Sequence, residues 1–165
     1  MISLFAAPFF LQGLAIFFDE FYFHRRRGLP TWERIGHPLD TLTVGISFAF
    51  VLYVPYSSNA GFVYLAIASF SCLFVTKDEW IHEANCSGKE MWLHSVLFVL
   101  HPVVLMLAGF IWFLKSHSQI SEMLGWRPSD LALAWFTLEA QLAIVFVFFL
   151  FQLVYWNLPW KQKRS

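Results

Sequence analysis

Five long apolar stretches constrain the fold of this chain more than any other feature. They lie at Ile2 to Phe23, Pro38 to Val54, Phe62 to Thr76, Met91 to Leu114 and Leu131 to Trp156. A bilayer core about 30 Å thick needs roughly 20 mostly apolar residues per helix. Only 13% of the residues are charged, against about 25% in soluble domains. We therefore expect an all-α integral membrane protein, a five-transmembrane-helix bundle in which residues 1–165 form one domain.

The basic residues predict the orientation of this bundle. Short loops rich in Lys and Arg stay in the cytoplasm, and nine of the eleven basic residues fall on one side of the predicted spans. This places the N-terminus outside and the C-terminus in the cytoplasm, with a bacterial inner (plasma) membrane as the expected location. The net charge of zero gives no reason to expect a nucleic-acid partner. The nine are Arg25, Arg26, Arg27, Arg34, Lys77, Lys89, Lys161, Lys163 and Arg164; the other two are Lys115 and Arg127.

Histidines and carboxylates recur in pairs at the predicted cytoplasmic ends of the first four spans. Residues three or four apart on a helix share a face, so each pair can point the same way. Four helix ends that meet in a bundle could then direct an acid and an imidazole toward one point. The pairs are Glu20 with His24, His37 with Asp40, Glu79 with His82, and Glu90 with His94.

Mixed carboxylate and imidazole donors are ligands that iron, manganese and zinc accept. The layout resembles that of the di-iron carboxylate bundles, which use Glu and Glu-x-x-His on facing helices, although only Glu79 and His82 keep that spacing. We expect a transition metal here, iron and up to two ions being favoured and zinc the alternative. The expected ligands are Glu20, His24, His37, Glu79, His82, Glu90 and His94.

We give two further acids, Asp19 and Asp40, lower priority as ligands. Asp19 adjoins Glu20 on a different helical face. His37 precedes Pro38, which predicts an extended residue just before a helix that begins at that proline. Asp40 would then lie in the first helical turn, where the helix dipole alone explains a carboxylate.

Two further ionisable residues lie deeper in the apolar stretches. His101 follows His94 by two helical turns, and Glu139 lies near the middle of the fifth stretch. An ionisable group at membrane depth is expensive and is a functional hypothesis by default. We expect both to face the bundle interior, where they could hydrogen-bond each other.

These features favour a membrane metalloenzyme that oxidises, hydroxylates or desaturates a hydrophobic small molecule taken from the membrane lipids, with an electron donor as a further partner. Glu79, Glu90 and His101 are the candidate catalytic residues. One alternative is a zinc hydrolase of a lipid substrate, with Glu79 or Glu90 as the base. Another is a transporter of protons or divalent cations that uses His94, His101 and Glu139. A structural subunit would leave the paired pattern unexplained.

Overall fold

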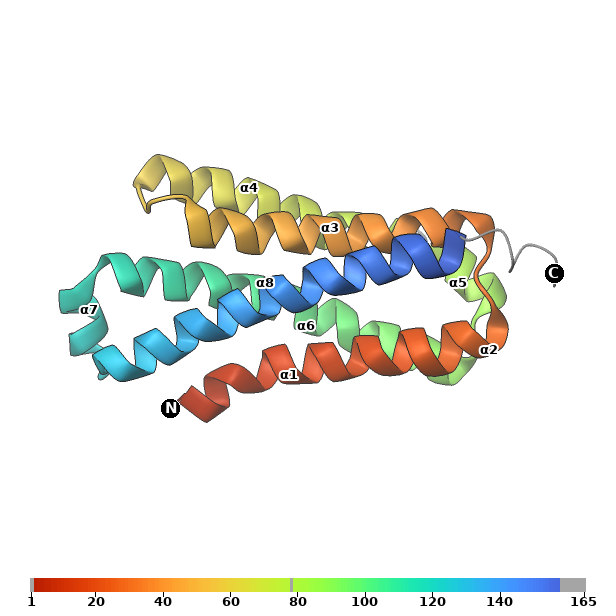
Figure 1. Cartoon of the computed structure of the whole chain (residues 1–165), viewed down its shortest axis with the longest axis horizontal. Coiled ribbons are helices and arrows are strands. Elements are labelled where there is room, and N and C mark those ends of the chain that lie inside the picture. The colour runs from red at the N-terminus through yellow and green to blue at the C-terminus, as the bar shows by residue number, and fades with distance from the viewer. Residues whose placement is uncertain (1, 78, 158–165) are drawn as a thin grey trace.

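The computed structural model is a bundle of helices that run side by side (Figure 1). It describes residues 2–77 and 79–157, and the side chains of these residues except 2–4, 80, 81 and 84. The long helices are α1 (Ile2–Phe18), α3 (Thr31–Tyr53), α4 (Ser58–Phe74), α6 (Gly88–Ser116) and α8 (Pro128–Asn157). Shorter segments join them: the π-helix η1 (Asp19–His24), α2 (Arg25–Arg27), α5 (Glu79–Asn85) and α7 (Ser118–Met123).

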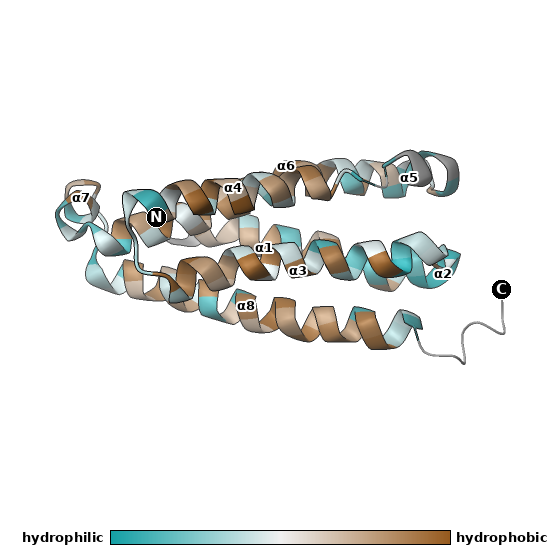
Figure 2. Cartoon of the chain, turned by 90° about the horizontal axis from the view of Figure 1, so that it is seen from above, coloured by the Kyte–Doolittle hydropathy of each residue, from teal (hydrophilic) through white to brown (hydrophobic). Residues whose placement is uncertain are grey.

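The helices place the paired residues at one end of the bundle. Helix α3 packs along α8 and α4, while α1 packs against α6 and α8. The segments η1, α2 and α5 and the last turns of α8 lie at one end, opposite α7 and the start of α1 (Figure 1). Hydrophobic residues fill the length of the long helices, and hydrophilic ones gather near α2 and α5 (Figure 2).

Three of the described helices, α3, α6 and α8, are long and apolar enough to cross a membrane. They indicate a membrane protein. Helices α1 and α4 each have 17 residues, although α1 continues directly into η1 and α2. The predicted fold class is therefore confirmed as an all-helical membrane protein, while the number of five spans stays a prediction.

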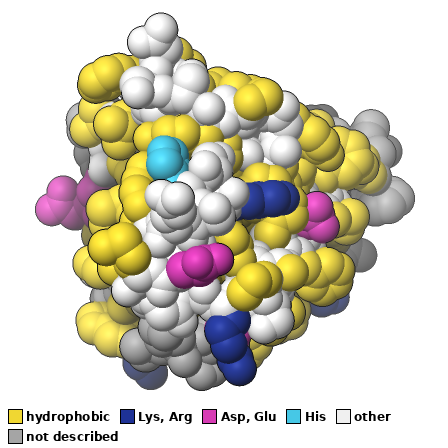
Figure 3. Space-filling view, turned by 90° about the vertical axis from the view of Figure 1, so that its left-hand side faces the viewer, with side chains coloured by type: hydrophobic (Ala, Val, Ile, Leu, Met, Phe, Trp, Pro, Cys, Tyr) yellow, Lys and Arg dark blue, Asp and Glu magenta, His cyan; other side chains and the backbone are white. Residues whose placement is uncertain are grey.

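An apolar core fills the half of the bundle nearer α7. Phe48, Val51, Ile111 and Leu138 are almost completely buried there, together with neighbours from all five long helices. We call this part the apolar half. The end of the bundle seen in Figure 3 carries α7, and there a few charged side chains lie among hydrophobic ones. Burial of apolar surface is therefore concentrated at one end of the molecule.

Gly109 permits a close approach of α4 to α6 within the apolar half. A Cβ atom at this position would lie 2.6 Å from Cε1 of Tyr64. The hydroxyl of Tyr64 donates a hydrogen bond of 2.6 Å to the carbonyl oxygen of Leu105. Only a residue without a side chain leaves room for this ring against the α6 backbone.

Helix α3 begins seven residues before the predicted start at Pro38. The positive φ of 77° at Gly28 turns the chain after α2, and Pro30 caps the helix that starts at Thr31. The prediction of an extended His37 was therefore wrong, because the break at Gly28 to Pro30 sets the helix start and Pro38 is accommodated within the helix. His37 lies within α3, and Asp40 lies beyond its first turn.

Candidate metal centre

Four histidine side chains from four helical segments lie next to one another at the end of the bundle opposite the apolar half, and we call them the histidine cluster. His24 lies on η1, His37 on α3, His82 on α5 and His94 on α6. Successive ring centroids are 4.7 Å (His24 to His37), 6.0 Å (to His82), 4.4 Å (to His94) and 6.4 Å (back to His24) apart. The bundle thus brings together all four histidines predicted as ligands.

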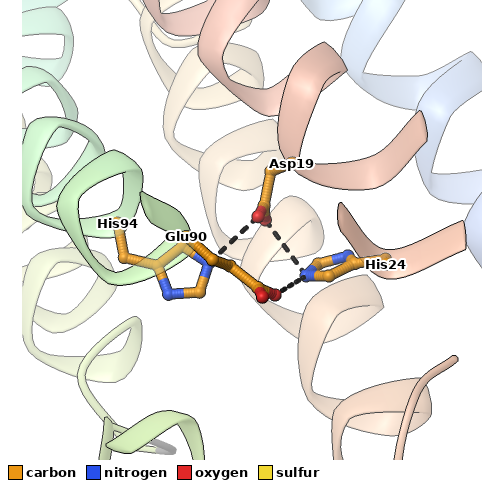
Figure 4. Close-up of side chains that lie close together, drawn as sticks. All are labelled: Asp19, His24, Glu90 and His94. Carbon is orange, nitrogen blue, oxygen red and sulfur yellow. Dashed lines mark hydrogen bonds and ion pairs between the residues drawn. The ribbon is translucent and has the colours of Figure 1, made fainter. Parts of the chain in front are cut away.

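A first group of ligand atoms comes from Asp19, His24, Glu90 and His94, all of them buried (Figure 4). Nε2 of His94 lies 3.0 Å from Oδ1 of Asp19. Nε2 of His24 lies 3.2 Å from Oδ2 of Asp19 and 3.9 Å from Oε1 of Glu90. Ligand atoms bound to one ion at about 2.1 Å lie about 3 to 3.5 Å from one another. The group could therefore hold a metal ion with small side-chain adjustments.

The π-helix explains why Asp19 belongs to this group. In an α-helix, residues five apart point about 140° away from each other, which separates Asp19 from His24. The wider turn of η1 has hydrogen bonds from residue i to i+5, so residues five apart come onto nearly the same face. Asp19 was therefore assigned too little weight from its sequence position, because the prediction assumed α-helical geometry throughout.

A second group consists of His24, Glu33 and His37, so both groups share His24. Glu33 is completely buried, and its carboxylate oxygens lie 3.8 Å from Nε2 of His37 and 3.8 Å from Nε2 of His82. The prediction did not include Glu33 among the candidate ligands. Its spacing of four residues from His37 was the available signal, but the helix was expected to start only at Pro38.

Three other predicted ligands lie at the edge of these groups. Glu20 is buried, 3.6 Å from Nδ1 of His24, and accepts hydrogen bonds from Gln152 (3.1 Å) and from the indole of Trp156 on α8. His82 is buried between Glu33 and His94. The side chain of Glu79 is 39% exposed, while its Oε2 atom is buried 3.8 Å from Nδ1 of His82.

Two of the carboxylates share one guanidinium. Arg27 donates to Glu33 at 2.8 Å and to Glu90 at 3.0 Å. Burial opposes the charge of Arg27, yet its hydrogen bonds and charge interactions with these two carboxylates raise its pKa. Arg27 is therefore a permanent cation in the wall of the centre.

The four buried carboxylates outnumber this cation. They belong to Asp19, Glu20, Glu33 and Glu90, and their other contacts among the described residues include histidines, Gln152, Trp156 and the thiol of Cys86. This leaves an excess of three negative charges when the histidines are neutral. Buried charges need compensation, which bound cations, protons on the histidines or protons on the carboxylates themselves would supply.

Several buried imidazole nitrogens have carboxylate oxygens nearby but no well-formed protein hydrogen bond. Within the described part of the chain, both ring nitrogens of His24 and Nδ1 of His94 are buried and make no hydrogen bond of acceptable geometry. Native proteins hydrogen-bond most buried polar atoms, and exceptions call for an explanation. A metal ion accepts the lone pair of such a nitrogen directly.

His101 and Glu139 do not form the predicted pair. His101 is buried, and its Nε2 lies 3.0 Å from the hydroxyl of Ser71. Glu139 is exposed on α8. The expectation that Glu139 faces the bundle interior was wrong, because the neighbouring Leu138 occupies the buried face of α8 and Glu139 is exposed.

A cavity of about 290 Å³ connects the centre with His101. Asp19, Glu20, His24, His37 and His94 line one end of it. Its remaining wall is largely apolar and comes from α1, α3, α6 and α8. Small-molecule sites commonly combine an apolar cavity with a few polar groups.

The chain was compared with protein families, with curated proteins and with solved structures, and none of the three comparisons finds a match. The function must therefore be argued from the geometry of the centre and its cavity.

Proposed function

We propose that the protein is a multi-pass membrane metalloenzyme that oxidises a lipid-soluble molecule. The observation that carries the proposal is the histidine cluster of His24, His37, His82 and His94, which lies among several buried carboxylates. A largely apolar cavity borders this histidine cluster. Iron supplies redox chemistry when bound to such ligands. The chain itself supplies a buried pocket that keeps the ligands in place and limits access of water.

Two ligand groups lie side by side and support a centre with up to two ions, although His24, which is common to both, would bind only one of them as a neutral imidazole. Asp19, Glu90 and His94 would belong to one ion, and Glu33 and His37 to the other. The hydrogen bonds from Arg27 to Glu33 and Glu90, and those from Gln152 and Trp156 to Glu20, would orient the carboxylates. Such second-layer contacts commonly orient metal ligands.

Oxidation of a substrate by O₂ requires a partner that supplies electrons. A hydroxylation converts a C–H bond into C–OH and reduces the second oxygen atom of O₂ to water, which consumes two electrons and two protons. A redox protein or a reduced cofactor must deliver the electrons. Desaturation has the same demand for O₂ and electrons, removes two hydrogen atoms from the substrate and releases two molecules of water.

A zinc hydrolase is the second candidate. A zinc site with three protein ligands lowers the pKa of a bound water to about 7, and a carboxylate can serve as the base. The exposed edge position of Glu79 suits a base that exchanges protons with solvent. Transport has less support, because the exposure of Glu139 removes one of the two groups expected to cross the membrane interior.

The membrane arrangement belongs to the same proposal. Helices α1 and α4 would join α3, α6 and α8 as spans, and the metal centre would lie at the cytoplasmic face of a bacterial inner membrane. Arg25, Arg26, Arg34 and Lys89 surround this end of the bundle. Lys161, Lys163 and Arg164, which also entered the prediction of orientation, lie outside the described residues.

Metal analysis of the purified protein tests the proposal. We expect one to two iron atoms per chain by elemental analysis, together with an absorption spectrum of iron in oxygen and nitrogen coordination. His94→Ala should lower the metal content to near zero. His117→Ala is the matched control, because His117 packs against Phe113 and Tyr56 at the other end of the bundle. A metal-free wild type, or equal loss from both variants, would refute the proposal, and zinc without iron would favour the hydrolase.

A further inference from the structure

The cavity carries polar groups at two separate levels. One level is the metal centre itself. The other comprises Gln12, His101 and Gln141, which line the cavity farther from the centre. Gln12 precedes Asp19 by seven residues, and His101 follows His94 by seven, so at 1.5 Å per residue both positions lie about 10 Å from the centre. Two helices therefore place a second polar level at the same depth.

The second level retains hydrogen-bonding capacity for a ligand. Nε2 of Gln12 lies 3.5 Å from Nδ1 of His101, at the outer limit of a hydrogen bond. A glutamine amide can donate two hydrogen bonds and accept two, so this contact leaves most of its capacity for a molecule in the cavity. Nε2 of His101 is held by Ser71, which in turn contacts the hydroxyl of Thr43 at 2.8 Å. These contacts fix the imidazole beside the cavity.

The cavity reaches the outer surface of the bundle between α1 and α8. Phe17 on α1 and Ile144 on α8 both line it, yet they are 54% and 59% exposed. Gly13 also lines it, is exposed, and has open space where a Cβ atom would lie. In a membrane this side faces lipid, so a hydrophobic molecule can enter without passing through water.

From these features we infer the substrate class of the proposed enzyme, an inference that rests on the proposed function. The substrate is a lipid-soluble molecule with an apolar body and one hydroxyl or carbonyl oxygen, and it enters sideways past Gly13. Gln12, which His101 contacts and positions, binds the oxygen through its remaining hydrogen-bonding capacity, and an apolar carbon about 10 Å away reaches the metal centre. An all-apolar chain is disfavoured, because it would leave most of the hydrogen-bonding capacity of the Gln12 amide unused in an apolar wall.

Photolabelling of the protein in phosphatidylcholine nanodiscs tests this inference. The probe is a ten-carbon alcohol that carries a diazirine, and mass spectrometry locates the labelled residues. We expect labels on cavity residues such as Phe98 and Val145. Unlabelled 1-decanol should compete about fivefold better than decane, which is the effect of one hydrogen bond worth about 1 kcal/mol. Gln12→Leu should remove this preference.

Two variants of α1 test the route of entry. Gly13→Phe should abolish labelling of the cavity, since its ring would fill the opening. Leu14→Phe is the matched control, because Leu14 is 41% exposed and lies outside the cavity lining. Absence of cavity labels, equal competition by decane, or full labelling of Gly13→Phe would overturn the inference.

The metal content of the same samples separates the two proposals. Metal-containing protein without cavity labels would refute the substrate class and leave the metalloenzyme standing. Metal-free protein that still labels in the cavity, with the preference for decanol, would refute the metalloenzyme and leave a lateral binding site for an amphipathic lipid.

Discussion

The two halves of the bundle are held together in opposite ways. The apolar half buries Phe48, Val51, Ile111 and Leu138 at the α7 end. The polar half, which we define by the buried residues Asp19, Glu20, His24, Glu33, His82, Glu90 and His94, contains ionisable side chains at comparable burial. Apolar burial stabilises without a partner, whereas buried charge stabilises only when it is compensated. The apolar half therefore stabilises the fold, whereas the polar half depends on compensation of its buried charges.

Removal of the metal should produce the largest difference between the halves. Uncompensated buried charge costs about 3 kcal/mol or more, so a chelator should speed amide hydrogen exchange in η1 and α5 by at least about a hundredfold. Exchange in α6 beyond Val104 should stay unchanged. Hydrogen exchange with mass spectrometry in nanodiscs measures both regions. Uniform acceleration throughout the bundle would contradict the separation into halves.

Gly109→Ala should affect the apolar half alone. The new Cβ would lie 2.6 Å from the ring of Tyr64, and overpacking of this kind costs about 1 to 3 kcal/mol. Thermal unfolding in detergent should show the loss, while the metal content stays at the wild-type level. Gly88→Ala is the control, because open space surrounds its Cβ position on the same helix. Metal loss from Gly109→Ala would show that the halves are coupled.

Cys86 lies beside the polar half, and the alkylation rate of its thiol measures burial there. Burial raises the pKa of its thiol to about 12, although the charge of Arg27 opposes this. The thiolate is the reactive form, so alkylation in a Cys72→Ser background should be at least about tenfold slower at pH 8 than for a free thiol of pKa about 8.5. The rate should keep rising from pH 9 to 11. A plateau near pH 9 would contradict the burial of this thiol.

The exposed ion pair between Arg127 and Asp130 should give the smallest effect. Arg127 is 77% exposed, and its Nε lies 3.0 Å from Asp130 Oδ2. Exposed pairs contribute little because water screens them. Arg127→Ala should leave both the unfolding midpoint and the metal content at wild-type values. A clear fall in the midpoint would assign this pair a structural role.

The sequence predicted the helical membrane class and the meeting of four histidines, because both follow from long apolar stretches and from spacing on a helix. His24, His37, His82 and His94 came together as expected. Asp19 and Glu33 were misjudged because their roles depend on local backbone geometry. A π-turn and a helix that continues through Pro38 depend on tertiary contacts that spacing alone does not encode.

The exposure of Glu139 could not be predicted from the sequence either. The fifth apolar stretch is hydrophobic on all sides, so its sequence does not indicate which face packs against the bundle. Helix α8 makes its most extensive contacts with α3, and this choice turns Glu139 outward. The cavity was also beyond prediction, because its wall combines residues from four separate long helices.

The π-helix at Asp19–His24 has a consequence for how such a centre can arise or disappear. A π-turn is equivalent to an α-helix with one residue inserted, so deletion of one residue within it would restore α-helical register. His24 and the arginines after it would then rotate by about 100° relative to the rest of α1. The chain would keep its first apolar helix and lose one wall of the polar half. A single codon thus separates an apolar helix without these side chains from one that contributes Asp19 and His24 to the candidate metal centre.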